Sequence, residues 1–250
     1  MGRPVVNRVG EKYRTNEGYE AEILESISSK NNTIRLNDEY GTILYNRAFK
    51  EIKNGKIKNP YHRSVYGVGF SGQGKYKISL NRVVTKCGNR WSKILERCYD
   101  EKALIKHPTY RVCSVDEEWH NFQNFAPWFE DNYNPKTMSD WHLDKDILIK
   151  GNKIYSPATC CFVPAEINTL FTLNNINRGL LPIGVQREGN KYRAAMSDNY
   201  IGTFDTIEEA FQAYKIEKEK LIKKLADKWK HLIKESVYIA LYNYIVEITD

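Results

Sequence analysis

The C-terminal part of the chain holds three strand-like segments followed by one helix, and this order restricts the fold more than any other feature. The segments are 183–187, 191–196 and 200–204, and the turns between them are short enough for antiparallel hairpins. Thr206 and Glu209 have the spacing of a capping box, so we expect a helix to begin there and to run to about Trp229. The order predicts a three-stranded sheet with one helix behind it and a tail, 237–248, that docks as a helix or a strand.

The middle strand, 191–196, predicts which side chains face the helix. Side chains alternate between the two faces of a strand, so Lys191 and Arg193 point one way and the apolar residues after each point the other. Arg187 lies within hairpin distance, and we expect it on the same basic face. A ribbon of this width fits the major groove, where Arg pairs with guanine and Lys engages phosphate. We therefore predict Arg187, Lys191 and Arg193 as contacts to double-stranded DNA.

The charge of +7 is unevenly distributed along the 250 residues. Residues 1–90 hold 17 Lys and Arg against 8 Asp and Glu, residues 91–173 hold 9 against 12, and residues 174–250 hold 12 against 11. Basic flanks around an acidic centre suit an enzyme that grips phosphates and holds a metal in its middle. A pattern that serves solubility alone is the other interpretation.

Composition restricts the class of protein. The length favours two or three modest domains. No stretch approaches the ~18 apolar residues of a membrane span, and the start has no apolar signal region, so we expect a cytoplasmic protein with no membrane partner. The five cysteines include no Cys-x-x-Cys pair, which argues against a disulfide framework or a structural zinc site.

Residues 1–85 predict a small, basic, β-rich domain. The segments 20–25 and 33–36 alternate as strands do, around a polar turn at 28–32. Four glycines between 67 and 74 could suggest a nucleotide-binding loop. No long helix follows them, and Lys75 is followed by Tyr76 in place of Ser or Thr, so we reject a P-loop and expect a basic loop or linker.

Residues 88–173 predict a second domain that begins with helices. The apolar side chains at 91, 94, 95 and 98 fall on one helical face, and a second helix carries apolar residues at 119, 122, 125, 126 and 129. We interpret these aromatic residues as a packed core. Further along, a strand ending at Asp144 and Asp146, a Gly-Asn turn at 151–152 and a helix entered near Pro164 predict a β-turn-β-helix hook. Such a hook brings a strand carboxylate near a helix side chain, where a divalent ion favours oxygen ligands.

The C-terminal segment resembles a known DNA-binding domain, that of plant ethylene-response factors, whose relatives occur in phage and mobile-element endonucleases. The resemblance runs from Pro182 to Tyr214, about a fifth of the chain, and is carried by Gly-Thr-Phe-Asp-Thr at 202–206, Glu-Glu-Ala at 208–210 and Ala-Tyr at 213–214. It implies a domain over 178–235, with an extension to 250, that binds DNA through Arg187, Lys191 and Arg193.

The central segment resembles the HNH endonucleases, especially a phage subgroup, over about 80 residues. The matching positions are Trp91, Arg97-Cys98-Tyr99, Trp119, Phe122, Phe125, Leu143-Asp144-Lys145, Gly151-Asn152, Tyr155-Ser156-Pro157 and Cys160. The resemblance implies Asp144 as a metal ligand, Asn152 as the middle Asn of the loop and Asn168 as the ligand position on the helix. Asp146 is a further candidate ligand, and Mg²⁺ or Mn²⁺ is the expected ion.

Lys145 departs from the HNH pattern, because the His that acts as general base should stand there. A lysine near its ordinary pKa is protonated at neutral pH and is a poor base, although burial beside cations lowers its pKa. His142, two residues before Asp144, or a metal-bound hydroxide would then replace the base. His142 as an ordinary histidine, and Asp144 and Asp146 as capping residues, are the structural alternatives; Glu118 and His120 are further catalytic candidates.

Together these features predict an α+β protein with three parts: a β-rich N-terminal domain, a central HNH-like ββα-metal domain with helices, and a C-terminal domain of three strands and a helix. The expected function is that of a phage homing endonuclease, acting in the host cytoplasm, which binds DNA and hydrolyses phosphodiester bonds as a nick or a double-strand cut. The alternative is a DNA-binding regulator that keeps the fold without cleavage, and Lys145 favours it. A protein with no nucleic-acid role is disfavoured by the basic sheet face.

Overall fold

The computed structural model describes residues 6–171, 181–196 and 199–248. It is a mixed α+β protein in which the chain forms two compact units. The first unit comprises Met1–Pro108 and Glu117–Ala126, and the second comprises Thr109–Asp116 and Pro127–Asp250. The division therefore passes through the segment 88–173. Within the described residues, no helix has both the length and the apolar character needed to cross a bilayer.

The first unit begins with a four-stranded antiparallel sheet in the order β1-β2-β3-β4, followed by the short helix α1. The elements are β1 (Lys12–Arg14), β2 (Glu20–Ser28), β3 (Asn31–Leu36), β4 (Ile43–Arg47) and α1 (Phe49–Lys53). Alternate residues of β2 and β3, among them Ile23 and Ile34, meet α1 in a small core. The expected turn at 28–32 is shorter, because Asn31 and Asn32 belong to β3, where the Asn32 amide donates to the carbonyl of Arg47 (2.7 Å).

The glycine-rich stretch that follows is a loop, as expected, with single β-bridges at Val65–Gly69 and Phe70–Asn121 and a small hairpin of β5 (Ser79–Leu80) and β6 (Val83–Val84). A close approach explains one glycine. A Cβ on Gly69 would lie 2.5 Å from Leu95 Cδ1, so a larger residue would collide with the helix that follows.

That helix, α2 (Lys86–Tyr99), buries Trp91, Ile94, Leu95 and Cys98, which confirms the predicted apolar face. It is followed by α3 (Glu101–Lys106), two 3₁₀ turns at Pro108–Val112 and Glu117–His120, and α4 (Phe122–Asn132). Trp119 lies in the second 3₁₀ turn, one turn before α4, and its carbonyl accepts a hydrogen bond from Trp91 Nε1 (2.7 Å). The aromatic residues form a core, as the sequence predicted.

The second unit contains the expected hook. Its elements are β7 (Ser114–Val115), β8 (Trp141–Asp144), β9 (Ile154–Tyr155), β10 (Cys161–Pro164) and α5 (Ala165–Leu170). Strand β10 pairs antiparallel with β8, with Cys161 opposite Asp144, and β7 pairs in parallel with β9. We use "hook" below for residues 141–170.

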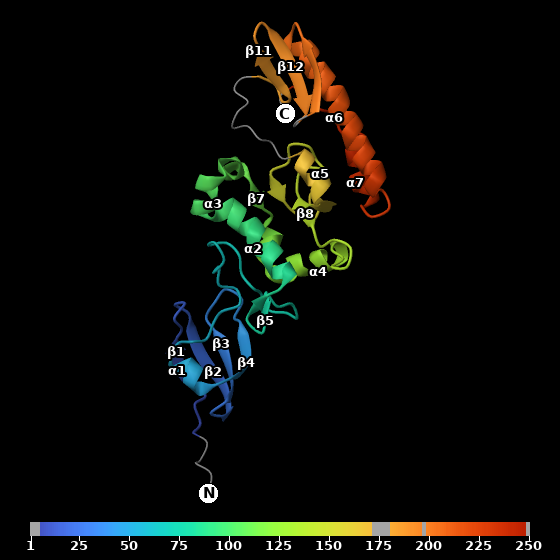
Figure 1. Ribbon diagram of the computed structural model, residues 1–250. Coiled ribbons are helices and arrows are strands. Elements are labelled where there is room, and N and C mark those ends of the chain that lie inside the picture. The colour runs from blue at the N-terminus through green and yellow to red at the C-terminus, as the bar shows by residue number, and fades with distance from the viewer. Residues whose placement is uncertain (1–5, 172–180, 197–198, 249–250) are drawn as a thin grey trace. The chain divides into compact units, whose positions relative to one another are not determined.

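The C-terminal part of this unit is a three-stranded antiparallel sheet in the order β11-β12-β13 with the long helix α6 along one face (Figure 1). The elements are β11 (Val185–Glu188), β12 (Lys191–Met196), β13 (Asn199–Phe204), α6 (Ile207–Trp229) and α7 (Glu235–Tyr242). Thr206 and Glu209 form the predicted capping box, in which each side chain accepts a hydrogen bond from the other residue's backbone N–H. The tail docks as a helix, α7, with Val237 and Leu241 buried.

Candidate nucleic-acid interface and the central hook

The register of the C-terminal sheet determines which side chains α6 leaves uncovered. Residues opposite one another in antiparallel strands project to the same side. Val185 is opposite Ala194, and both are buried, so this pair marks the side that α6 covers. Lys191 and Arg193 lie on the other side, as predicted. We call that side the open face, and its residues are Gln186, Glu188, Lys191, Arg193, Ala195, Tyr200 and Thr203.

Arg187 does not share this face, and the prediction that it would is wrong. It is opposite Tyr192, which puts both side chains on the side of the sheet that α6 covers. Arg187 is nevertheless exposed, and its Nε donates to the carbonyl of Gly189 (3.3 Å) in the adjacent turn. The closeness of Arg187 to Lys191 and Arg193 in the hairpin therefore did not place its side chain on their face. The pairing register decides the face of each side chain, and a difference of one residue in the register reverses it.

Tyr200 joins the basic residues on the open face, and the sequence analysis missed it. A β-bulge between the pairs at Ala194 and Ala195 places Tyr200, in place of Ile201, opposite Ala195. The Arg193 guanidinium lies 5.5 Å from the centre of the Tyr200 ring, and the Tyr200 hydroxyl is 3.0 Å from Thr203 Oγ1. The ring is 55% exposed, so it is available to a ligand.

Two acidic side chains contact the open face. Glu188 accepts a hydrogen bond from Thr203 Oγ1 (2.9 Å), and Asp205 lies 2.9 Å from Lys191 Nζ. The Lys191–Asp205 pair is exposed at both ends, and such pairs are weak in water. The open face therefore carries two cations, the Glu188 carboxylate and one aromatic ring, and the Asp205 carboxylate pairs with one of the two cations.

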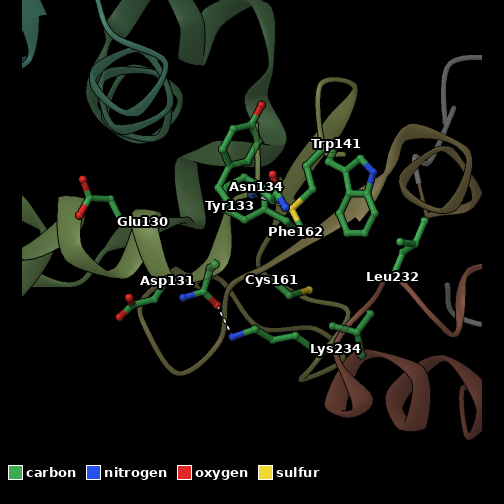
Figure 2. A pocket seen from close by; sticks show the side chains of 12 residues that line it. Glu130, Asp131, Tyr133, Asn134, Trp141, Cys161, Phe162, Leu232 and Lys234 are labelled. Carbon is green, nitrogen blue, oxygen red and sulfur yellow. Dashed lines mark hydrogen bonds between the residues drawn. The ribbon is translucent and has the colours of Figure 1, made fainter. Parts of the chain in front are cut away.

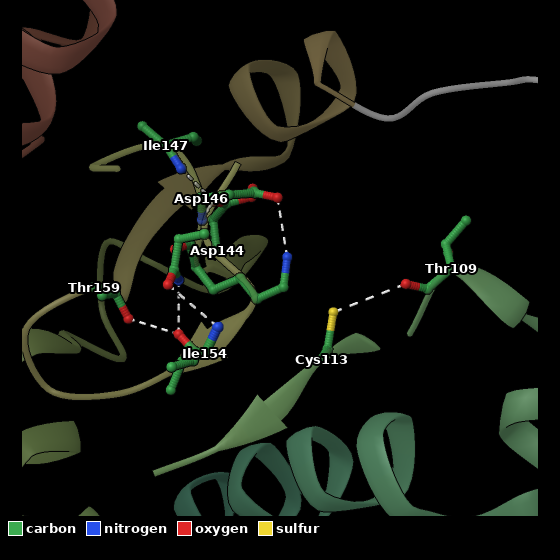
Figure 3. Close-up of polar contacts among 9 residues, drawn as sticks. Thr109, Cys113, Asp144, Asp146, Ile147, Ile154 and Thr159 are labelled. Carbon is green, nitrogen blue, oxygen red and sulfur yellow. Dashed lines mark hydrogen bonds and ion pairs between the residues drawn. The ribbon is translucent and has the colours of Figure 1, made fainter. Parts of the chain in front are cut away.

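In the hook, the carboxylate of Asp144 accepts hydrogen bonds from the backbone of the turn that follows it. Its Oδ1 accepts the backbone N–H groups of Asp146 (2.8 Å) and Ile147 (2.9 Å), as Figure 3 shows. Burial, together with the negative charge of Asp146, raises the pKa of Asp144 to about 6 despite these two hydrogen bonds. Asp144 therefore acts as a capping group for residues 144–147.

Lys145 is buried beside Asp146 and pairs with it. Its Nζ lies 2.9 Å from Asp146 Oδ2, and its side chain is 9% exposed against 36% for Asp146. Burial alone would lower the pKa of Lys145, but the hydrogen bond and charge of Asp146 outweigh burial and raise it. Lys145 therefore stays protonated at neutral pH, and it is unsuited to the role of general base.

The other predicted hook residues come from β8, from the loop before β9 and from α5. The Asn152 side-chain amide donates hydrogen bonds to the backbone carbonyls of Lys145 and Ile154, both at 2.7 Å, and so stabilises the loop. His142 lies on β8 opposite Val163 and is exposed, and Asn168 is half-buried on α5.

The expected divalent ion stays a prediction, and the hook offers it few open ligands. The described residues contain no group of three or more His, Cys, Asp or Glu side chains placed to hold a metal. A magnesium site needs one or two carboxylates that are open to the ion and its waters. Here one oxygen of Asp144 caps the turn, and the Lys145 ammonium already neutralises Asp146.

Glu118 and His120 lie in the first unit, whereas Asp144 lies in the second. His120 is buried, and its ring makes an edge contact with Tyr99 at 5.9 Å between centroids, with Nε2 3.4 Å from the Tyr99 hydroxyl. His120 is thus part of an aromatic packing arrangement in that unit.

A cavity of about 170 Å³ opens elsewhere in the second unit (Figure 2). Trp141, Cys161 and Phe162 line it, and at its rim Lys234 donates to Asn132 Oδ1 (2.5 Å). Burial raises the pKa of the Cys161 thiol far above its ordinary range, so it is not a nucleophile. None of the predicted site residues lines this cavity.

Comparisons of the chain with protein-family models, with curated proteins and with solved structures each found no match.

Proposed function

We propose that this protein binds double-stranded DNA through the open face of the β11–β12–β13 sheet. The proposal rests on one observation: Lys191 and Arg193 lie together beside exposed Tyr200, on the side that α6 leaves uncovered. A phosphate competes readily with Asp205 for Lys191, because an exposed ion pair contributes little free energy. The Arg193 guanidinium lies 5.5 Å from the centre of the exposed Tyr200 ring, so a base or a phosphate that reaches this ring also meets a cation.

Glu188 gives the open face a means of distinguishing one DNA base from another. A carboxylate repels phosphate, but it accepts a hydrogen bond from the amino group of cytosine in the major groove. Its partner Thr203 holds it in place on the open face. We therefore expect contacts to base edges near Glu188 and Arg193, and contacts to phosphate at Lys191.

The proposal is tested with Lys191→Ala/Arg193→Ala, and Arg187→Ala provides a matched control. All three residues are basic and belong to one hairpin, but Arg187 lies on the other side of the sheet. In anisotropy titrations of a labelled duplex, we expect the double variant to lose about tenfold or more in affinity and its salt dependence to flatten by one to two ions. Arg187→Ala should change affinity much less. Equal losses from both variants, or none, would contradict the proposal.

A second candidate function, DNA cleavage at the hook, is favoured by the succession of β8, β10 and α5, a ββα arrangement. The Lys145–Asp146 ion pair speaks against it, so we place the non-cleaving regulator first. Incubation of supercoiled plasmid with Mg²⁺ or Mn²⁺ decides between them. Nicking by the wild-type protein that Asp144→Ala abolishes would establish an endonuclease, whereas duplex binding without nicking would support the regulator.

A further inference from the structure

A groove in the first unit, separate from the open face and the hook, has three tyrosines among its nine lining residues. It follows the β3–β4 turn and strand β4, and its volume of about 610 Å³ lies in the usual range of ligand sites, ~300–1,000 Å³. Its side-chain lining is mainly Tyr40, Ile43, Tyr45, Arg47, Tyr61 and Gln73. Neither the predicted DNA contacts nor the hook residues belong to it.

Rings near this groove form a row in which Tyr40 is exposed and Tyr61 and Phe70 are half-buried. Tyr40 and Tyr45 are 58% and 63% exposed, which is high for large side chains. The rings of Tyr40 and Tyr61 lie 4.4 Å apart with a 32° tilt, and Tyr61 contacts Phe70 at 5.8 Å. Tyr40 and Tyr61 thus pack against each other, and the exposed surfaces of Tyr40 and Tyr45 offer faces on which other planar groups stack.

The turn that presents Tyr40 is held by a polar network. Asp38 accepts hydrogen bonds from the backbone N–H and hydroxyl of Thr42 (2.8 and 2.5 Å) and from the Asn59 amide (2.8 Å). These hydrogen bonds lower the pKa of Asp38 despite its partial burial, so it stays ionised and the turn stays closed. Tyr40 is therefore presented on a braced turn.

The charges near the groove select an anionic ligand. Arg47 lines one end, and its buried Nε has no hydrogen-bond acceptor in the described protein. Arg63 is exposed beside the aromatic row, with its guanidinium 5.9 Å from the centre of the Phe70 ring. Glu39, beside Tyr40, is an acidic neighbour, but residues 1–90 as a whole carry 17 Lys and Arg against 8 Asp and Glu. This excess favours a polyanion with planar groups.

A peptide strand added to the edge of β4 is the competing occupant, and Gln73 disfavours it. An added strand needs free carbonyl and N–H groups along the edge. The Gln73 amide already donates to the carbonyl of Ile43 (2.9 Å), at the start of β4. The edge is thus partly covered by the protein's own side chain.

We propose that this groove binds single-stranded nucleic acid, with bases stacked on Tyr40 and Tyr45 and phosphates held by Arg47 and Arg63. Stacking on aromatic side chains is tolerant of sequence, and the cations follow the backbone. The proposal does not depend on the open face, and it assigns the β-rich unit a binding role of its own.

The test is an anisotropy titration of the full-length protein with a labelled thymidine homopolymer. We expect Tyr40→Ala/Tyr45→Ala to lose about tenfold or more in single-strand affinity, because each stacked base contributes about this much. Tyr40→Phe/Tyr45→Phe keeps the rings and should keep binding. Tyr242→Ala, which removes an exposed tyrosine from α7, is the matched control and should have no effect.

Two outcomes would overturn the proposal: no binding of the single strand by the wild-type protein, or unchanged affinity in the alanine double variant while its circular dichroism stays native. The open face is judged separately. Lys191→Ala/Arg193→Ala should weaken duplex binding and leave most of the single-strand affinity, so failure of one site is distinguishable from failure of the other.

Discussion

The hook and the C-terminal sheet were both expected to present polar side chains to DNA, but they use these side chains in opposite ways. In the hook, Asp144 and Asn152 bind the protein's own backbone, and Lys145 pairs with Asp146. In the sheet, Lys191 and Arg193 extend from the side opposite the one that α6 covers. A polar residue at a motif position is therefore available to a ligand only where the fold has not already used it.

The free energies of burial explain this difference. A charge removed from water must be paired and hydrogen-bonded, or it destabilises the fold. Lys145 meets this condition through Asp146, and Asp144 meets part of it through two backbone N–H groups. On the open face, Lys191 pairs only with an exposed carboxylate, that of Asp205, so it can exchange this partner for phosphate at low cost. Three substitutions test this contrast.

The largest effect is expected where the sheet meets its helix. Gly184 has a φ of +77°, and a Cβ there would lie 2.0 Å from the buried ring of Tyr214 on α6. Overpacking and a left-handed backbone together should make Gly184→Ala lower the free energy of unfolding by about 4 kcal/mol. Gly189, at φ +61° in open space, is the matched control, and its alanine variant should lose about 1 kcal/mol. Urea unfolding measures both, and similar losses would mean that α6 does not brace the open face.

A second substitution tests the internal cation of the hook. Lys145→Met leaves Asp146 unpaired next to Asp144 and should lower the free energy of unfolding by about 3 kcal/mol, at the low end for a buried pair because Asp146 is partly exposed. Lys220→Met breaks an exposed pair with Glu217 and should cost less than about 0.5 kcal/mol. Thermal melting with and without Mn²⁺ sharpens the result, because wild-type protein should not respond to the ion. A large rise in its melting temperature would show that the hook does hold a metal.

The third substitution concerns pH. The pKa of Asp144 is raised from 3.8 to about 6, so the folded state binds its proton more tightly than the unfolded state. Stability should then fall as pH rises from about 4 to about 6, and the loss should persist above pH 6. Asp144→Asn keeps an oxygen for the turn and removes this dependence. We expect it to raise the free energy of unfolding by about 2 kcal/mol at pH 7 and hardly at all at pH 4. A variant less stable than wild type at pH 7 would show that the ionised carboxylate is needed there.

Local patterns in the sequence predicted most of the elements near these regions. The three C-terminal strands, the capping box of Thr206 and Glu209 and the end of α6 near Trp229 follow the prediction closely. The apolar face of α2 and the helix start after Pro164 do so too. Each of these features depends on residues a few positions apart, so it can be read directly from the sequence.

The positions of individual site residues could not be predicted in this way. Arg187 lies on the covered side because of its pairing with Tyr192, and Tyr200 reaches the open face because of a bulge in β13. The burial of Lys145 and the row of rings from Tyr40 to Phe70 likewise depend on contacts between separate segments.

The sequence by itself determined the order of strands and helices and where several of them begin and end, because hydrophobic period, caps and turns act over a few residues. Only the tertiary structure decided which polar side chains remain open to a ligand. Cross-strand register and burial decide that question, and both are set by pairings between residues that the chain brings together only on folding.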